Sequence, residues 1–109
     1  MRALSALAIP AVLLLPPWAS RGAPTAARTR AREVLKAARC DKCHDSSVNA
    51  DNAQALAVYD LASEGWPATM KDAQLPKLLS RLKSAAAADQ QAVREFIRNE
   101  LASRAARRH

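Results

Sequence analysis

The chain has 109 residues, of which 50% are hydrophobic, 4% aromatic and 25% charged. A single small domain is the default for this length, and so few aromatic side chains supply little bulk for its core. The formal net charge of +7 raises the question of nucleic-acid binding, but the basic residues are scattered and no recognition motif accompanies them, so we expect no nucleic-acid partner.

The N-terminal segment has the pattern of a secretory signal peptide. Arg2 supplies a positive charge, and residues 3–15 form an apolar run that ends at Pro16. This run is too short to span a bilayer, so we expect no stable membrane insertion, with an uncleaved anchor as the alternative. The pattern predicts a signal peptide at 1–22, a mature domain at 23–109 and a periplasmic location.

The next segment is expected to be helical from Pro24 up to the first cysteine, with Pro24 in the first turn. Ala31, Val34, Leu35 and Ala38 recur at helical spacing and form a narrow apolar stripe. Most of the remaining surface of this helix is basic and is expected to be solvated: Arg28, Arg30, Arg32, Lys36 and Arg39.

The two cysteines of the chain lie in the run Cys40-Asp41-Lys42-Cys43-His44. The spacing C-x-x-C-H is typical of a covalent haem attachment site. Each thiol can add to one haem vinyl group, and the imidazole of His44 is then held beneath the ring, free to bind iron. The motif therefore predicts one covalently attached haem c.

The cysteine pair could also belong to three other kinds of site. A thioredoxin-like dithiol follows a strand, whereas the residues before Cys40 look helical. A structural zinc site uses four protein ligands, and outside the motif only His109 adds to the usual Cys and His set. A disulfide would close a tiny loop and gain little stability.

A helix that runs directly into C-x-x-C-H resembles the first helix of the class I c-type cytochromes. The resemblance implies an all-α, cytochrome c-like bundle of about three to four helices around the haem. It also implies thioether bonds at Cys40 and Cys43, proximal ligation by His44, and one-electron transfer with a redox protein partner. An acidic docking face on that partner would match the basic tail of the chain. We expect a monomer without enzymatic turnover, because no general base, nucleophile or substrate cleft is visible.

The segment after the motif is less regular. The polar residues 45–52 predict a loop, and Asn52 is a suitable cap for a short helix reaching towards Leu61. The second ring nitrogen of a ligating histidine normally donates to a carbonyl or carboxylate. In the family a proline soon after the motif often supplies this carbonyl, but none follows until Pro67. We therefore expect the acceptor to be a carbonyl between residues 46 and 52, or Asp45.

Three residues downstream are candidates for haem contacts. Met70 is the sole methionine apart from the initiator, and a thioether opposite the proximal histidine raises the reduction potential. It is predicted as the sixth ligand, with core packing or a surface position as alternatives. Trp66 and Tyr59 each carry a polar tip on an apolar body and are candidates for hydrogen bonds to a haem propionate, with ordinary core packing as the alternative.

The C-terminal part is expected to form two helices. The first is predicted from Thr69 to Lys83, kinked or opened by Pro76, and the second has Asp89 as its cap. The apolar face of the second is the expected partner of the first helix of the domain: Val93, Phe96, Ile97 and Leu101. The basic tail, residues 104–109, is expected to be a frayed, solvated end, with a docking patch for an acidic partner as the alternative.

Two other functions remain open at this point. If Met70 faces away, a five-coordinate haem iron would bind NO or CO as a sensor or ligand binder. If no haem is attached, the cysteine pair belongs to a thiol-disulfide or metal-binding protein.

Overall fold

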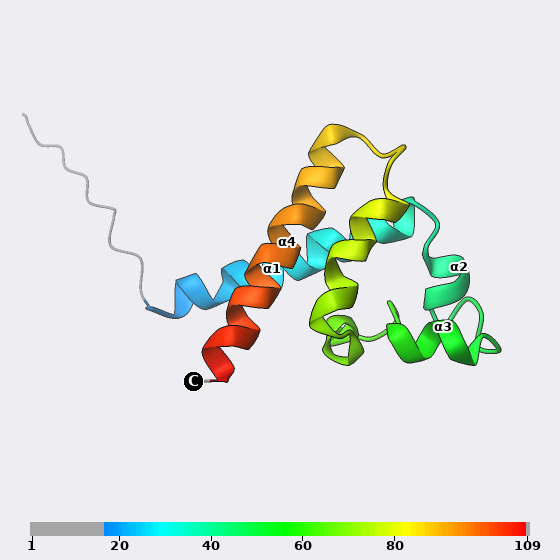
Figure 1. Ribbon diagram of the computed structural model, residues 1–109, viewed down its shortest axis with the longest axis horizontal. Helices are drawn as coiled ribbons and strands as arrows, with labels where there is room; N and C mark the ends of the chain where they lie inside the picture. The colour runs from blue at the N-terminus through cyan, green and yellow to red at the C-terminus, as the bar shows by residue number, and fades with distance from the viewer. Residues whose placement is uncertain (1–16, 109) are drawn as a thin grey trace, which may run out of the picture.

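Two helices of 21 residues, α1 (Pro17–Ala37) and α4 (Ala87–Arg107), form the frame of the molecule. They cross each other in the computed structural model, which describes residues 17–108 (Figure 1). No strand occurs within that range, and the predicted all-α fold is confirmed. The segment that joins the two long helices contains two short α-helices and two 3-10 helices: α2 (Asp41–His44), α3 (Ala53–Val58), η3 (Trp66–Thr69) and η4 (Asp72–Arg81).

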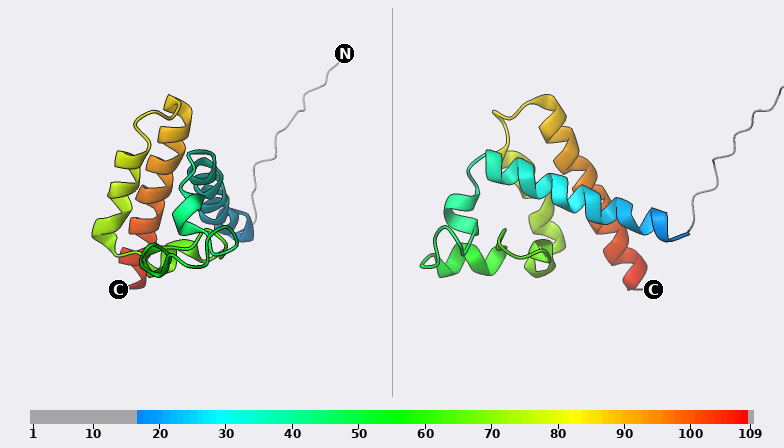
Figure 2. Two further views of the ribbon diagram at one scale, coloured as in Figure 1. Left: turned by 90° about the vertical axis from the view of Figure 1, so that its right-hand side faces the viewer. Right: turned by 180° about the vertical axis from the view of Figure 1, so that it is seen from behind.

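The core lies where α1 and α4 cross, and η4 packs along α4 on the other side (Figure 2). Leu35 of α1 and Val93 of α4 are fully buried, and Phe96 is 1% exposed. Each such side chain contributes about 1.5–3 kcal/mol by leaving water. The predicted pairing of the first and last helices is therefore confirmed.

The start of α1 differs from the prediction. The helix begins at Pro17, so the expected start at Pro24 is wrong. A proline suits the first turn because its missing N–H would have no helical partner there, and Pro17 takes that position. The predicted signal peptide at 1–22 lies mostly outside the described residues. None of the helices in the range 17–108 has the length and apolar character needed to cross a membrane.

The C-terminal turn of α1 leads the chain into the cysteine motif. Arg39 has a φ of 71°, in the left-handed region. Its N–H donates to the carbonyl of Lys36 (2.9 Å), and the N–H of Cys40 donates to the carbonyl of Leu35 (3.0 Å). This is the Schellman arrangement, in which glycine is the usual residue at the position of Arg39. A side chain there costs about 1 kcal/mol of backbone strain.

The loop at 45–52 is as predicted. Asp45 is buried and accepts a hydrogen bond from the backbone N–H of Ser47 (2.9 Å). The side chain of Asn52 accepts from the N–H of Ala55 (3.2 Å), which confirms the predicted cap. α3 then ends at Val58, short of Leu61.

The predicted helix from Thr69 to Lys83 is wrong in its start and its type. A 3-10 helix, η4, begins at Asp72, after the backbone N–H of Lys71 donates to the side chain of Gln74 (2.7 Å). One feature of the sequence favours the tighter helix. Buried Leu75 and Leu78 are three residues apart, and a 3-10 helix has three residues per turn.

α4 differs from the prediction at both ends. Ala86 is its N-cap and Asp89 lies inside the first turn, so the expected cap at Asp89 is wrong. The side chain of Gln90 instead donates to the carbonyls of Leu82 and Ala85, both at 3.0 Å. The helix continues to Arg107, and the side chain of Arg104 is only 11% exposed. The expected frayed, solvated tail is therefore wrong for Arg104.

Candidate functional site

The cysteine motif forms the corner between α1 and α2. Cys40 is the N-cap of α2, which contains Cys43 and ends with His44. Both thiols are free; Cys40 is partly buried and Cys43 is exposed. The N–H of His44 donates to the carbonyl of Cys40 (3.0 Å), so a single helical turn sets the relative positions of the two thiols and the imidazole.

The imidazole of His44 is oriented by backbone carbonyls. Its Nδ1 lies 2.9 Å from the carbonyl oxygen of Ala55 and 3.3 Å from that of Tyr59. Carbonyls only accept hydrogen bonds, so Nδ1 carries a proton, and Nε2 is the ring nitrogen that a neutral imidazole would offer to a metal. The expected acceptor, a carbonyl of residues 46–52 or Asp45, is wrong. The loop at 45–52 brings the chain back to His44, so the carbonyls come from α3 and from Tyr59, the residue after it.

Tyr59 covers one face of the His44 ring. The two ring centroids are 3.9 Å apart, with planes inclined by 7°, and Tyr59 is 5% exposed. Stacking on the face leaves the Nε2 lone pair free, because that lone pair lies in the plane of the ring. Tyr59 and Cys40 line the same cavity, and burial raises the pKa of both groups. Tyr59 therefore shares the cavity with the first cysteine and stacks on the histidine.

A cavity of about 650 Å³ opens beside the motif, within the range typical of cofactor sites. Cys40, Cys43 and His44 line it from α2, and Met70, which is 4% exposed, lines it from the segment between η3 and η4. The structure thus brings Met70 to the same cavity as the motif, although 26 residues separate it from His44 in the chain.

Of the two aromatic candidates, only Tyr59 lines this cavity. Trp66 is 2% exposed and packs between Tyr59 and Phe96, with ring centroids 5.7 Å and 5.0 Å away. Its indole Nε1 is buried and has no hydrogen-bond partner within the described part of the chain. A buried unpaired donor costs about 1–3 kcal/mol, but Trp66 does not line the cavity, so its position is that of a core residue.

The mouth of the cavity is basic. Arg39 at the end of α1, and Lys77 and Arg81 on η4, are exposed and line it. Sequence reasoning missed this group, because its members come from two elements and none of them belongs to a recognisable motif.

These residues fit a covalently attached haem. Two thiols, an imidazole with a free Nε2 and a thioether line one cavity of suitable size. Within residues 17–108, no group of three or more His, Cys, Asp or Glu side chains is arranged to hold a metal ion; His109 lies outside this range. The chain matches no family model, no curated protein and no solved structure.

Proposed function

We propose that the protein is a monohaem c-type cytochrome that carries single electrons in the bacterial periplasm. One observation carries the proposal: both thiols of the motif, the imidazole of His44 and the thioether of Met70 line the same cavity of about 650 Å³. Cys40 and Cys43 would form the two thioether bonds. A haem held there supplies an iron that alternates between the ferric and ferrous states.

The chain's own residues would fix how the iron is bound. The carbonyls of Ala55 and Tyr59 hold the N–H of His44, which raises the basicity of Nε2 and orients the ring. Stacking by Tyr59 restricts rotation of the same ring. Met70 would be the sixth ligand, and thioether ligation raises the reduction potential. Of the two aromatic candidates for haem contacts, Tyr59 lines the cavity and would contact the haem directly, whereas Trp66 packs behind Tyr59.

The basic mouth suggests how a partner would dock. Arg39, Lys77 and Arg81 surround the opening through which the cofactor edge would be reached. Complementary charge guides association of redox proteins and raises its rate. We therefore propose a redox partner with an acidic face. The protein itself would act as a monomer and would have no catalytic turnover.

The test is expression of the full chain, with its N-terminal segment, in a bacterial host that has haem-attachment machinery. We expect a red periplasmic protein whose mass exceeds that of the polypeptide by one haem. Its oxidised form should show a methionine-to-iron charge-transfer band that Met70→Ala removes. Double replacement Cys40→Ser and Cys43→Ser should remove the covalent haem.

Three outcomes separate the competing functions. A colourless protein of bare polypeptide mass would overturn the proposal and leave the thiol-disulfide or metal-binding reading. Attached haem with no methionine band and rapid CO binding by the reduced protein would favour the five-coordinate ligand binder. Attached haem with the band would support electron transfer.

A further inference from the structure

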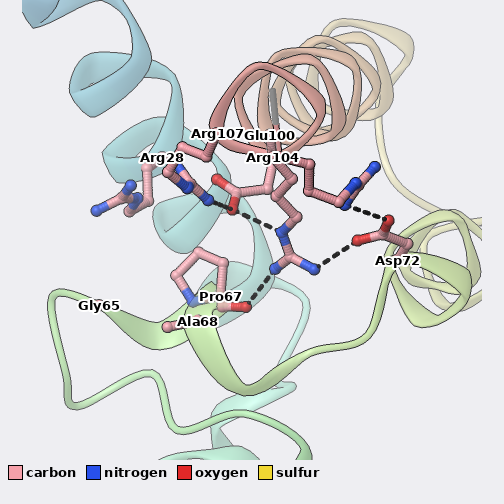
Figure 3. Close-up of a pocket in the computed structure, with 9 residues that line it drawn as sticks. Arg28, Gly65, Pro67, Ala68, Asp72, Glu100, Arg104 and Arg107 are labelled. Atoms are coloured by element: carbon pink, nitrogen blue, oxygen red, sulfur yellow. Dashed lines mark hydrogen bonds and ion pairs between the residues drawn. The ribbon is translucent and has the colours of Figure 1, made fainter.

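Arg104 joins the C-terminal helix to the segment that contains Met70. Its guanidinium donates to two backbone carbonyls, from Nη1 to Met70 and from Nη2 to Pro67, both at 2.7 Å. Nη1 also reaches Oδ1 of Asp72 and Nε reaches Oε2 of Glu100, both at 2.9 Å (Figure 3). The side chain is only 11% exposed, and every nitrogen of the guanidinium is used.

The contacts are concentrated where the chain has little regular structure. Met70 is the residue at which η3 ends, and its backbone is extended (φ −79°, ψ 140°). Its N–H donates to the carbonyl of Pro67 (3.0 Å), the carbonyl that Arg104 also binds. Arg104 thus contacts the η3 turn, the Met70 carbonyl and the first residue of η4.

A second link holds the same segment from the other side. The hydroxyl of Thr69 donates to the carbonyl of Val58 at 2.8 Å, at an exposed position. A single hydroxyl bond there contributes less than a half-buried charged donor with several acceptors. Arg104 is therefore the stronger of the two anchors.

The anchor also has a rigid base. α4, which carries Arg104, packs against α1, and the C-terminal turn of α1 leads into Cys40. The two sides of the cavity are therefore connected through the α1 and α4 core. Movement of the Met70 backbone away from the motif would break the contact between Arg104 and the Met70 carbonyl.

We propose that Arg104 is a positioning residue for Met70: by binding the carbonyls of Met70 and Pro67, it holds the Met70 thioether at the cavity opposite His44. The inference rests on the proposed function, in which Met70 is the sixth ligand. Arginine suits this role because its planar guanidinium presents five N–H donors in a fixed fork, whereas lysine offers a point charge. Glu100 and Asp72 balance the charge of the half-buried group.

The experiment compares the oxidised and reduced holoproteins of the wild type, Arg104→Ala and Arg104→Lys. Arg107→Ala is the matched control, because it removes the same charge from the same helix. Within residues 17–108, the guanidinium of Arg107 makes polar contacts only with Ser103 and Glu100, not with the Met70 segment. The methionine-to-iron band and the far-ultraviolet helix signal are followed during heating. The rate of CO binding to the reduced protein is measured on the same samples.

In Arg104→Ala we expect the band to disappear at a temperature well below that at which the helices melt. We expect CO to bind about tenfold faster, because losing two charged hydrogen bonds raises the population with Met70 released by at least that factor. For Arg104→Lys, both the temperature at which the band disappears and the CO rate should lie between the values of Arg104→Ala and the wild type. This variant supplies the same measurements if Arg104→Ala does not fold. Arg107→Ala should behave as the wild type does.

An unchanged band and an unchanged CO rate in both Arg104 variants would overturn the inference. So would loss of the band and of the helix signal at one common, lowered temperature, since that marks a residue that only stabilises the fold. If the wild type lacks the band, ligation by Met70 fails together with the role of Arg104. If the wild type and both Arg104 variants keep the band, with the same CO rate, ligation stands and the role of Arg104 fails.

Discussion

The molecule has two sides that are stabilised in different ways. Where α1 and α4 cross, apolar side chains such as Leu35, Val93 and Phe96 are buried against one another. Around the cavity, residues of the same apolar core such as Trp66 are also buried, but side chains of distant residues bind backbone carbonyls as well. Arg32 donates to Leu61 (2.7 Å), and His44 and Arg104 make the carbonyl contacts described above.

This difference follows from the length of the elements. A helix of 21 residues presents several turns of one apolar face, whereas α2 has four residues and α3 has six. Helices this short cannot bury enough apolar surface to offset their loss of conformational entropy. Although Leu61 and Trp66 connect it to the apolar core, the cavity side therefore depends more on specific polar contacts and, in the proposed holoprotein, on the covalently held cofactor. We expect the two sides to respond differently to the same perturbation.

The two sides should differ most in stability when haem attachment is prevented. In the double variant Cys40→Ser and Cys43→Ser, amide hydrogen exchange should show protection at least about tenfold lower across residues 45–70 than in the holoprotein. Amides of α1 and of residues 93–101 should keep most of their protection and serve as the internal control. Equal loss on both sides would show that the molecule unfolds as one unit, against the comparison drawn here.

On the apolar side, Phe96→Ala should destabilise the holoprotein by about 3–5 kcal/mol, because it leaves a cavity in the core between α1 and α4. Urea unfolding measures this change. Glu95→Ala, at the exposed neighbouring position, is the matched control and should stay within about 0.5 kcal/mol of the wild type. A loss below about 1 kcal/mol in Phe96→Ala would mean that packing here is not the main source of stability.

The same division explains what the sequence alone could predict. The stripe of Val34 and Leu35 and the face of Val93, Phe96 and Ile97 repeat with the helical period, so their pairing could be predicted and is confirmed. The cap at Asn52 could also be predicted, because it acts only three residues along the chain. Local and periodic features leave a signal in the order of the residues.

The contacts around the cavity leave no such signal. Arg104 was expected in a solvated tail because its partners, the carbonyls of Pro67 and Met70, lie 37 and 34 residues away. Every residue has a carbonyl, so nothing in residues 67–70 marks them as acceptors. The same reason explains why the acceptors of His44 were not found. The C-x-x-C-H pattern could be noticed, because its five residues are adjacent, but the lining of the cavity could not be predicted.

Arg39 joins the two sides, and its strain can be relieved. Arg39→Gly should stabilise the protein by about 0.5–1 kcal/mol, because glycine adopts the left-handed conformation freely but loses more entropy on folding. Arg39→Ala keeps the strain and removes the same charge, so it should show no gain in urea unfolding. If both variants are equally stable, the backbone at Arg39 is not strained. If the partner docks on the basic mouth, both variants should also slow electron transfer at low salt.

The smallest expected effect is a pH dependence confined to the cavity side. Asp60 accepts hydrogen bonds from the backbone N–H groups of Ser46 (2.9 Å) and Ala62 (3.0 Å). Hydrogen bonding by Ser46 is the main reason why the pKa of the Asp60 carboxyl lies below its ordinary value of 3.8. A pKa lowered in the folded state means that the unfolded chain binds the proton more tightly. The resulting stability is present above the ordinary value and is lost as the pH falls through the folded-state pKa.

Asp60→Asn should therefore be less stable than the wild type by about 0.5 kcal/mol near neutral pH, and urea unfolding should show this gap closing with acidification. The control is Glu64→Gln, an exposed carboxylate of the same loop; a gap of equal size at every pH would contradict the assignment to Asp60.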